Sequence, residues 1–218
     1  MNTKMAVNDN NKEKLIFLVN ACGYLRYGLA SLMADIDSQV RIISVSHPEE
    51  ILAYPFRHYD RPLIMVFLPQ EPGAAARGRV FLWRLDMLRL QKQFPVTLSC
   101  LLDGDRERWS VLLAGYRWLP RYGDIVNVRE TLLDILNTPG SAVLPRVNLN
   151  RCRLSSRQQY ILDETLVGRS VRDIAAHLEI SERAVFSART ALIMKIGLNN
   201  RMELMSLAGD ASGCFKFL

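Results

Sequence analysis

Hydrophobic and polar positions follow a mixed pattern over the first two thirds of the chain. From Leu15 to Asn137, short apolar runs alternate with longer segments of helical periodicity, which is typical of a parallel sheet covered by helices on both faces. The pattern predicts five strands, at Leu15–Val19, Val40–Val45, Leu63–Leu68, Val96–Leu101 and near Tyr116–Leu119. It predicts five helices, at about Tyr24–Ala34, from Glu49, and at about Gly78–Gln93, Arg106–Ala114 and Val128–Leu136. Five successive strand–helix units with right-handed crossovers predict an α/β, flavodoxin-like domain with a five-stranded parallel sheet.

The last third of the chain has helical periodicity only. Within Leu154-Ser155-Ser156, a serine can cap a first helix, and Gly168 is placed to end it. Ser170 and Ser181 can cap two further helices joined by a short turn, which is the arrangement of a helix-turn-helix, and a fourth helix is expected at Met202–Ala208. The segment Thr138–Arg153 has two prolines and a glycine and is the predicted linker. We therefore expect domains at residues 1–137 and 154–218, joined by residues 138–153.

Composition narrows the class of protein. The chain has 218 residues, of which 49% are hydrophobic and 23% charged, as in ordinary soluble globular proteins. No apolar run approaches the roughly 20 residues of a membrane span, and the polar N-terminus is unlike a signal peptide, so we expect a cytoplasmic protein without a membrane partner. The four widely spaced cysteines favour reduced thiols over disulfides or a zinc site.

Charge and the histidines bear on function. The net charge is +6, of which +4 lies after residue 145, and arginines outnumber lysines 22 to 6. The planar donor fork of arginine suits phosphate groups and base edges, so this balance favours a nucleic-acid partner without establishing one. His47, His58 and His177 are scattered, and we find neither a nucleophile–base pair nor a phosphate-binding glycine loop. We expect no enzyme activity, cofactor or metal.

A family resemblance rests on motifs spread over some fifty residues. These are L-S-S-R at 154–157, Gly168, D-I-A at 173–175, I-S-E at 180–182, Val185, K-I-G at 195–197 and N-R at 200–201. In this register the span Leu154–Leu207 resembles the four-helix DNA-binding domain of the LuxR/NarL (GerE-type) regulators. The resemblance implies a helix-turn-helix at about residues 170–189 whose second helix enters the major groove of double-stranded DNA, and a last helix that helps two domains dimerise.

Candidate DNA-binding residues follow from a helix wheel with Val185, Leu192 and Ile196 facing the core. The opposite face carries Arg183, Ser187, Thr190 and Met194, flanked by Phe186 and Ala191. We predict DNA contacts for Arg172, Arg183, Phe186, Ser187, Arg189, Thr190, Lys195 and Arg201, with Arg172, Lys195 and Arg201 on phosphates. For each charged residue a solvated surface position is the alternative. Arg189 lies close to the side of the helix that faces the core, so an ion pair within the domain competes with a DNA contact.

The sequence also departs from this family. The usual Thr-Val-Lys-x-His reads Ala184-Val185-Phe186-Ser187-Ala188, Glu179 occupies a turn position where glycine is common, and Tyr160 replaces an acidic residue. Loss of a phosphate-neutralising lysine lowers the expected DNA affinity of a homodimer. A heterodimer with another response-regulator-type protein could supply the missing contacts.

The N-terminal segment resembles a response-regulator receiver, with Arg26, Gly28 and Leu29 in the usual register. Aspartyl phosphorylation needs a carboxylate nucleophile after the third strand, acids after the first to hold Mg²⁺, and a lysine after the fifth. In this sequence the nucleophile position is Met65 or Leu68, and the position of the acids is Asn20-Ala21. The hydroxyl position after the fourth strand falls near Cys100, and no lysine occurs between Lys92 and Lys195. We therefore predict a pseudo-receiver that is not phosphorylated, similar to the auxiliary regulators of the enterobacterial Rcs system.

Three alternatives stay open from the sequence. Glu71 is either a solvated loop residue or a permanent negative charge that resembles the phosphorylated state. The helix Gly78–Gln93 is apolar on more than one face, so it is either buried or offers a dimerisation surface. The whole chain is either a phosphorylation-independent transcriptional regulator or an interaction protein that titrates a partner regulator with little DNA contact, which Phe186 and Ala188 would favour.

Overall fold

The computed structural model describes residues 14–35, 39–57, 61–104, 106–109, 113, 115–120, 124–138 and 153–208. Most of the predicted linker 138–153 lies outside these residues. The chain divides into two compact units, of which the second comprises Phe67–Phe94, Gly104–Ala114 and Pro145–Leu218. In the described part of the chain, no helix combines the length and apolarity that crossing a membrane requires.

A five-stranded sheet forms the first unit's core, with strand order β2-β1-β3-β4-β5. β1 (Lys14–Val19) pairs in parallel with β2 (Val40–Val45) and with β3 (Leu63–Leu68), with Ile16 opposite both Ile42 and Leu63. All six residues of β3 and five of the six in β1 are buried, as expected for central strands covered on both faces. This strand order is that of the flavodoxin-like folds, so the predicted fold class is confirmed.

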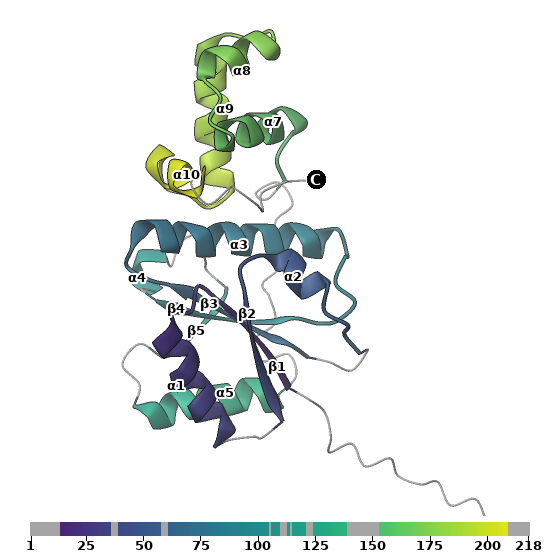
Figure 1. Ribbon diagram of the computed structural model, residues 1–218, viewed down its shortest axis with the longest axis vertical. Coiled ribbons are helices and arrows are strands. Elements are labelled where there is room, and N and C mark those ends of the chain that lie inside the picture. The colour runs from purple at the N-terminus through teal and green to yellow at the C-terminus, as the bar shows by residue number, and fades with distance from the viewer. Residues whose placement is uncertain are drawn as a thin grey trace, which may run out of the picture. The chain divides into compact units, whose positions relative to one another are not determined.

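The described residues of the first unit also form three helices, and two of these start within one or two residues of their predicted positions. They are α1 (Gly23–Ala34), α2 (Pro48–Leu52) and α5 (Ile125–Asn137). α1 and α5 lie on one side of the sheet and α2 on the other (Figure 1). α5 begins at Ile125, three residues before its predicted start.

The prediction for the fourth strand was wrong by three residues. β4 runs over Ser99–Gly104 rather than Val96–Leu101, and its Leu101 and Leu102 pair with Arg117 and Trp118 of the two-residue β5. Gly104 has φ +140°, and a Cβ atom there would lie 2.4 Å from the carbonyl oxygen of Leu68. Only glycine therefore allows the strand to end beside β3 at this point.

α3 (Pro72–Leu90) begins six residues before the predicted start at Gly78. Glu71 is its N-cap and Pro72 its first residue, an arrangement in which proline loses no hydrogen bond. Val80, Phe81, Leu82, Trp83 and Leu85 are all buried. Of the two alternatives for this helix, burial is therefore the one that the structure shows. α4 (Arg106–Trp109) follows β4, and the rest of the predicted helix Arg106–Ala114 falls largely outside the described residues.

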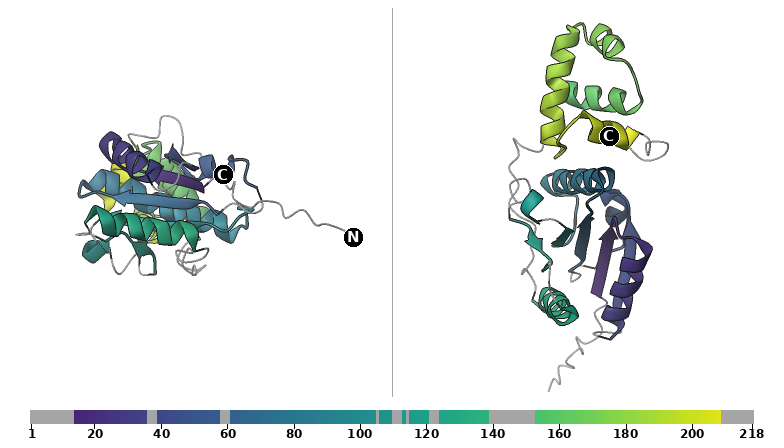
Figure 2. Two further views of the ribbon diagram at one scale, coloured as in Figure 1. Left: turned by 90° about the horizontal axis from the view of Figure 1, so that it is seen from below. Right: turned by 90° about the vertical axis from the view of Figure 1, so that its left-hand side faces the viewer.

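Among the described residues, the C-terminal part of the second unit consists of four helices, as predicted. They are α7 (Ser156–Leu166), α8 (Val171–His177), α9 (Glu182–Lys195) and α10 (Arg201–Ala208). α7 and α8 lie on one flank of α9, and α10 lies at its carboxyl-terminal end (Figure 2). Their shared core includes Ile161, Ile174, Val185, Leu192 and Leu204, each no more than 1% exposed.

Candidate nucleic-acid interface

Serine caps fix where the three helices of the interface begin. Ser155 accepts a hydrogen bond from the Gln158 backbone N–H at 3.2 Å and, with the Gln158 side chain, forms a capping box. Ser170 and Ser181 cap α8 and α9 through the N–H groups of Asp173 and Ala184. These three caps and the stop at Gly168, which has φ +88°, were all predicted from the sequence.

A short turn sets the orientation of α9 relative to α8. It runs through Glu179, which has φ +53°, a left-handed conformation that costs a non-glycine residue about 1 kcal/mol or more. The position where the family often has glycine therefore adopts the left-handed backbone conformation that favours glycine, although glutamate occupies it. The turn closes with the Ile180 N–H donating to the Ala175 carbonyl at 3.0 Å.

α9 exposes one continuous face in the second unit. Val185, Arg189, Leu192 and Ile193 point into the core, whereas Arg183, Phe186, Ser187, Thr190, Ala191 and Met194 are exposed. Phe186 is 48% and Met194 61% exposed. We call these six exposed residues the α9 face. They are the residues that the helix wheel placed opposite the core.

The α9 face carries one cation and two hydroxyl groups. The Thr190 hydroxyl donates to the Phe186 carbonyl at 3.1 Å, which leaves its lone pairs available to an incoming donor. Arg183 makes no hydrogen bond or ion pair with any other described residue. A helix with a guanidinium, hydroxyls and apolar tips on one exposed side can offer contacts to phosphates, to base edges and to thymine methyl groups.

Two of the predicted contact residues are placed differently. Arg189 is only 5% exposed, and its Nε has no hydrogen-bond partner within the described structure. Burial, followed by the positive charge of Arg201, lowers the pKa of Arg189. The arginine therefore does not belong to the α9 face, and the intradomain ion pair considered as the alternative is not observed among the described residues either.

Lys195 is the second such residue. It is partly buried, and its Nζ donates to the Arg153 carbonyl at 3.1 Å and to Oε1 of Gln158 at 3.0 Å. This ammonium group ties the end of α9 to the start of α7. The phosphate contact predicted for Lys195 would have to compete with these two bonds, whereas Arg172 and Arg201 are exposed.

Tyr160, at the position where the family usually has an acid, contacts α8. Its ring stacks on that of His177 with centroids 4.8 Å apart and an angle of 15° between the ring planes. The aromatic pair therefore connects α7 with α8.

Among the described residues, no carboxylate follows β1 or β3 directly, where phosphoryl transfer would need one. Asn20 follows β1, and β3 ends at Leu68 without an acid from 63 to 70. Cys100 lies buried inside β4, which continues to Gly104, so the end of the strand lies further along the chain than the predicted position near Cys100. Within the described residues no three His, Cys, Asp or Glu side chains are grouped so that they could hold a metal ion.

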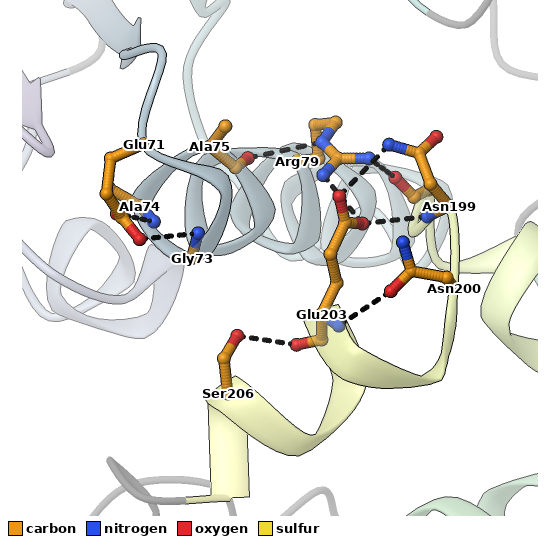
Figure 3. Close-up of polar contacts among 10 residues, drawn as sticks. Glu71, Gly73, Ala74, Ala75, Arg79, Asn199, Asn200, Glu203 and Ser206 are labelled. Carbon is orange, nitrogen blue, oxygen red and sulfur yellow. Dashed lines mark hydrogen bonds and ion pairs between the residues drawn. The ribbon is translucent and has the colours of Figure 1, made fainter.

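Glu71 has a local structural role. Its carboxylate accepts from the N–H groups of Gly73 at 2.8 Å and Ala74 at 2.5 Å (Figure 3). The hydrogen bond from Ala74, then that from Gly73, lowers the pKa of this carboxyl. The negative charge of Glu71 therefore serves as the cap of α3. This role accounts for the charge without any resemblance to a phosphorylated state.

Sequence reasoning missed a buried polar cluster between α3 and α10. Arg79 and Glu203 form an ion pair of 2.8 Å, with side chains 1% and 5% exposed. Arg79 lies in a segment whose apolar pattern predicted burial, and a charged residue there is a signal that a partner is required. The partner lies 124 positions further along the chain, which the local pattern could not indicate.

Comparison with known proteins identifies the C-terminal segment. Residues 153–208 match the family model of bacterial regulatory proteins of the luxR family. This part of the chain is therefore a LuxR-type helix-turn-helix domain, as its motifs indicated. No curated protein matches the chain.

Several solved structures are similar to this chain over most of its length. Two RcsB dimers bound to two parallel DNAs are 15% identical, with a TM-score of 0.42, over 93% of this chain and 100% of theirs. RcsB from Salmonella enterica serovar Typhimurium on the promoter P1flhDC is 13% identical, with a TM-score of 0.43, over 90% and 98%. FixJ from B. japonicum is 16% identical, with a TM-score of 0.37, over 90% and 97%. At these values the likeness says nothing further about what this chain binds.

Proposed function

We propose that this chain is a transcriptional regulator that binds double-stranded DNA through the α9 face. The observation that carries the proposal is that the second helix of a LuxR-type helix-turn-helix exposes Arg183, Ser187 and Thr190 together. Arg172 on α8 and Arg201 at the start of α10 are exposed near the ends of the same motif and would contact phosphates. The excess of positive charge after residue 145 supports an anionic partner.

The proposed regulator acts without phosphorylation, as a homodimer or as a heterodimer with another LuxR-type regulator. The lack of an acid from 63 to 70, across β3 and the two residues after it, and of a lysine between Lys92 and Lys195 supports the first part. Phe186 and Ala188, in place of polar residues, reduce the contacts that one protomer can offer. Exposed Met202 and Met205 on α10, 77% and 38% accessible, give a second protomer an apolar surface to bury.

The experiment is a titration of the purified chain against duplexes selected by it from a randomised library, at several salt concentrations. We expect binding whose affinity falls steeply with salt. Arg183→Ala should weaken binding about fivefold to tenfold and reduce the salt slope by about one if the arginine contacts a phosphate. Arg129→Ala, which removes the same charge from an exposed position on α5, is the matched control and should change little.

The alternative function gives a different result. If the chain titrates another regulator, it should bind no duplex on its own at any salt concentration, yet form a complex with a LuxR-type partner and remove that partner from DNA. Equal effects of Arg183→Ala and Arg129→Ala would show that the α9 face does not carry the contact.

A further inference from the structure

One stripe of α3 packs into the core of the LuxR-type helices. Ala76, Val80 and Trp83 belong to the same buried cluster as Leu192, Ile193, Leu204 and Leu207, and Met87 packs against it. Positions 76, 80, 83 and 87 follow the spacing of one helical face. The second unit therefore contains α3 together with α7 to α10.

Arg79 lies beside this stripe and binds the chain at the end of α9. Its Nη1 donates to the Gly197 carbonyl at 2.6 Å, its Nε donates to the Ala75 carbonyl at 3.2 Å, and its Nη2 lies 2.8 Å from Oε2 of Glu203 (Figure 3). Gly197 has φ +80° and follows Ile196, the C-cap of α9. One buried guanidinium thus holds the turn after α9 and the first turn of α10 together.

Glu203 extends the same contact into the turn between α9 and α10. Its carboxylate accepts from the Asn199 backbone N–H at 2.8 Å and from the Asn199 side-chain amide at 3.0 Å. The Glu203 backbone N–H in turn donates to the Asn200 side chain at 3.0 Å. The turn from Gly197 to Glu203 is therefore fixed by polar contacts that converge on a single ion pair.

A buried ion pair of this kind specifies geometry more than it adds stability. Desolvation of two charges offsets most of their attraction, but loss of one partner leaves the other charge buried and unpaired. Replacing Arg79 or Glu203 should therefore displace the turn between α9 and α10. An apolar pair of similar size would keep the elements together without this directional requirement.

We propose that Arg79 and Glu203 are positioning residues for DNA binding, through which α3 fixes the α9–α10 turn and so the orientation in which the α9 face is presented. This inference rests on the proposed function. Neither side chain reaches DNA, since both are almost completely buried. A molecule that displaces α3 would therefore change DNA affinity without touching the α9 face.

The test compares two charge-reversed single variants, Arg79→Glu and Glu203→Arg, with the native chain. The two single variants change the net charge in opposite directions, so a simple electrostatic effect on DNA would strengthen one and weaken the other. We expect both to weaken binding to the selected duplexes about tenfold, with the salt slope unchanged. Hydrogen exchange of the amides from 197 to 204 should become faster in both.

The conservative variant Arg79→Lys keeps a cation that can donate to the Gly197 carbonyl and pair with Glu203, so it should retain affinity to within about threefold of the native value. Circular dichroism reports whether each variant folds. Arg79→Met with Glu203→Met removes both charges and should fold but bind the duplexes about as weakly as the charge-reversed variants, because it lacks the directional contacts. Native or tighter affinity in Glu203→Arg, unchanged exchange in both charge-reversed variants, native affinity in the folded double variant, or an affinity of folded Arg79→Lys as low as that of the charge-reversed variants would overturn the inference.

Failure of this inference differs from failure of the proposed function. A native chain that binds no duplex contradicts the proposed function, and it contradicts the positioning role as well. A native chain that binds DNA, together with a Glu203→Arg variant that binds equally well, overturns only the positioning role of the ion pair.

Discussion

At the scale of single residues, the exposed positions of α9 could be predicted and the buried charges could not. Helical periodicity alone separates Arg183, Ser187 and Thr190 from Val185 and Leu192. Arg189 stands at the boundary angle, and only the packed structure shows that it is buried. The ion pair of Arg79 with Glu203 depends on a contact between distant parts of the chain, for which periodicity carries no information.

Asp163 on α7 provides a prediction for one residue. Partial burial raises the pKa of its carboxyl, against the hydrogen bond that it accepts from the Gln159 side chain at 3.0 Å. An acid with a raised pKa in the folded state binds its proton more tightly there than in the unfolded chain. Its contribution to the free energy of unfolding is therefore lost as the pH rises through that pKa.

Asp163→Asn keeps the acceptor for Gln159 and removes the charge. We expect this variant to have a free energy of unfolding higher by about 0.5 kcal/mol at pH 7, with the difference shrinking as the pH falls through the folded-state pKa. Urea denaturation at a series of pH values measures it. A variant less stable than the native chain at pH 7 would show that the carboxylate is favoured in the folded state.

At the scale of elements, the errors in the predicted boundaries have local causes. Pro72 and Gly73 look like a loop in sequence, yet behind the capping Glu71 they form the first turn of α3. The run from Val96 to Leu101 has strand composition, but β4 begins at Ser99 and continues to Gly104, and its Leu101 and Leu102 pair with β5. A cap formed by a glutamate and a pairing partner elsewhere in the sheet are both invisible to apolar periodicity.

The turn between α8 and α9 gives a prediction at this scale. Glu179→Gly should raise the free energy of unfolding by about 0.5–1 kcal/mol, because glycine adopts the left-handed conformation without a Cβ clash. Glu182→Gly is the matched control, since Glu182 lies in the first turn of α9, and it should lower the stability by up to about 1 kcal/mol. Thermal denaturation followed by circular dichroism distinguishes the two. A lower melting temperature for Glu179→Gly would mean that its side chain contributes more than its backbone conformation costs.

At the scale of the whole molecule, the sequence predicted the order of an α/β part and a helical part. The boundaries at 137 and 154 stay a prediction, because most of the segment between them lies outside the described residues. Contacts group α3 with the C-terminal helices, an association between segments far apart in the chain that the sequence pattern did not indicate.

The chemistry of the first unit gives a prediction for the intact chain. Incubation with acetyl phosphate and Mg²⁺ should leave its mass unchanged, because β3 ends without a carboxylate nucleophile. Mass spectrometry under conditions that preserve acyl phosphates measures this, with a phosphorylatable response regulator as the positive control. A mass increase of one phosphoryl group, mapped to an aspartate of the first unit, would contradict the pseudo-receiver.

The most direct measurement of the central claim is photo-cross-linking from the α9 face. A photoreactive phenylalanine derivative in place of Ser187 should cross-link to a selected duplex, and the same residue in place of exposed Tyr24 on α1 should not. Unlabelled duplex of the same sequence should abolish the cross-link. Equal cross-linking from both positions, or none from position 187 in a chain that still binds the duplex, would show that DNA contacts some other surface.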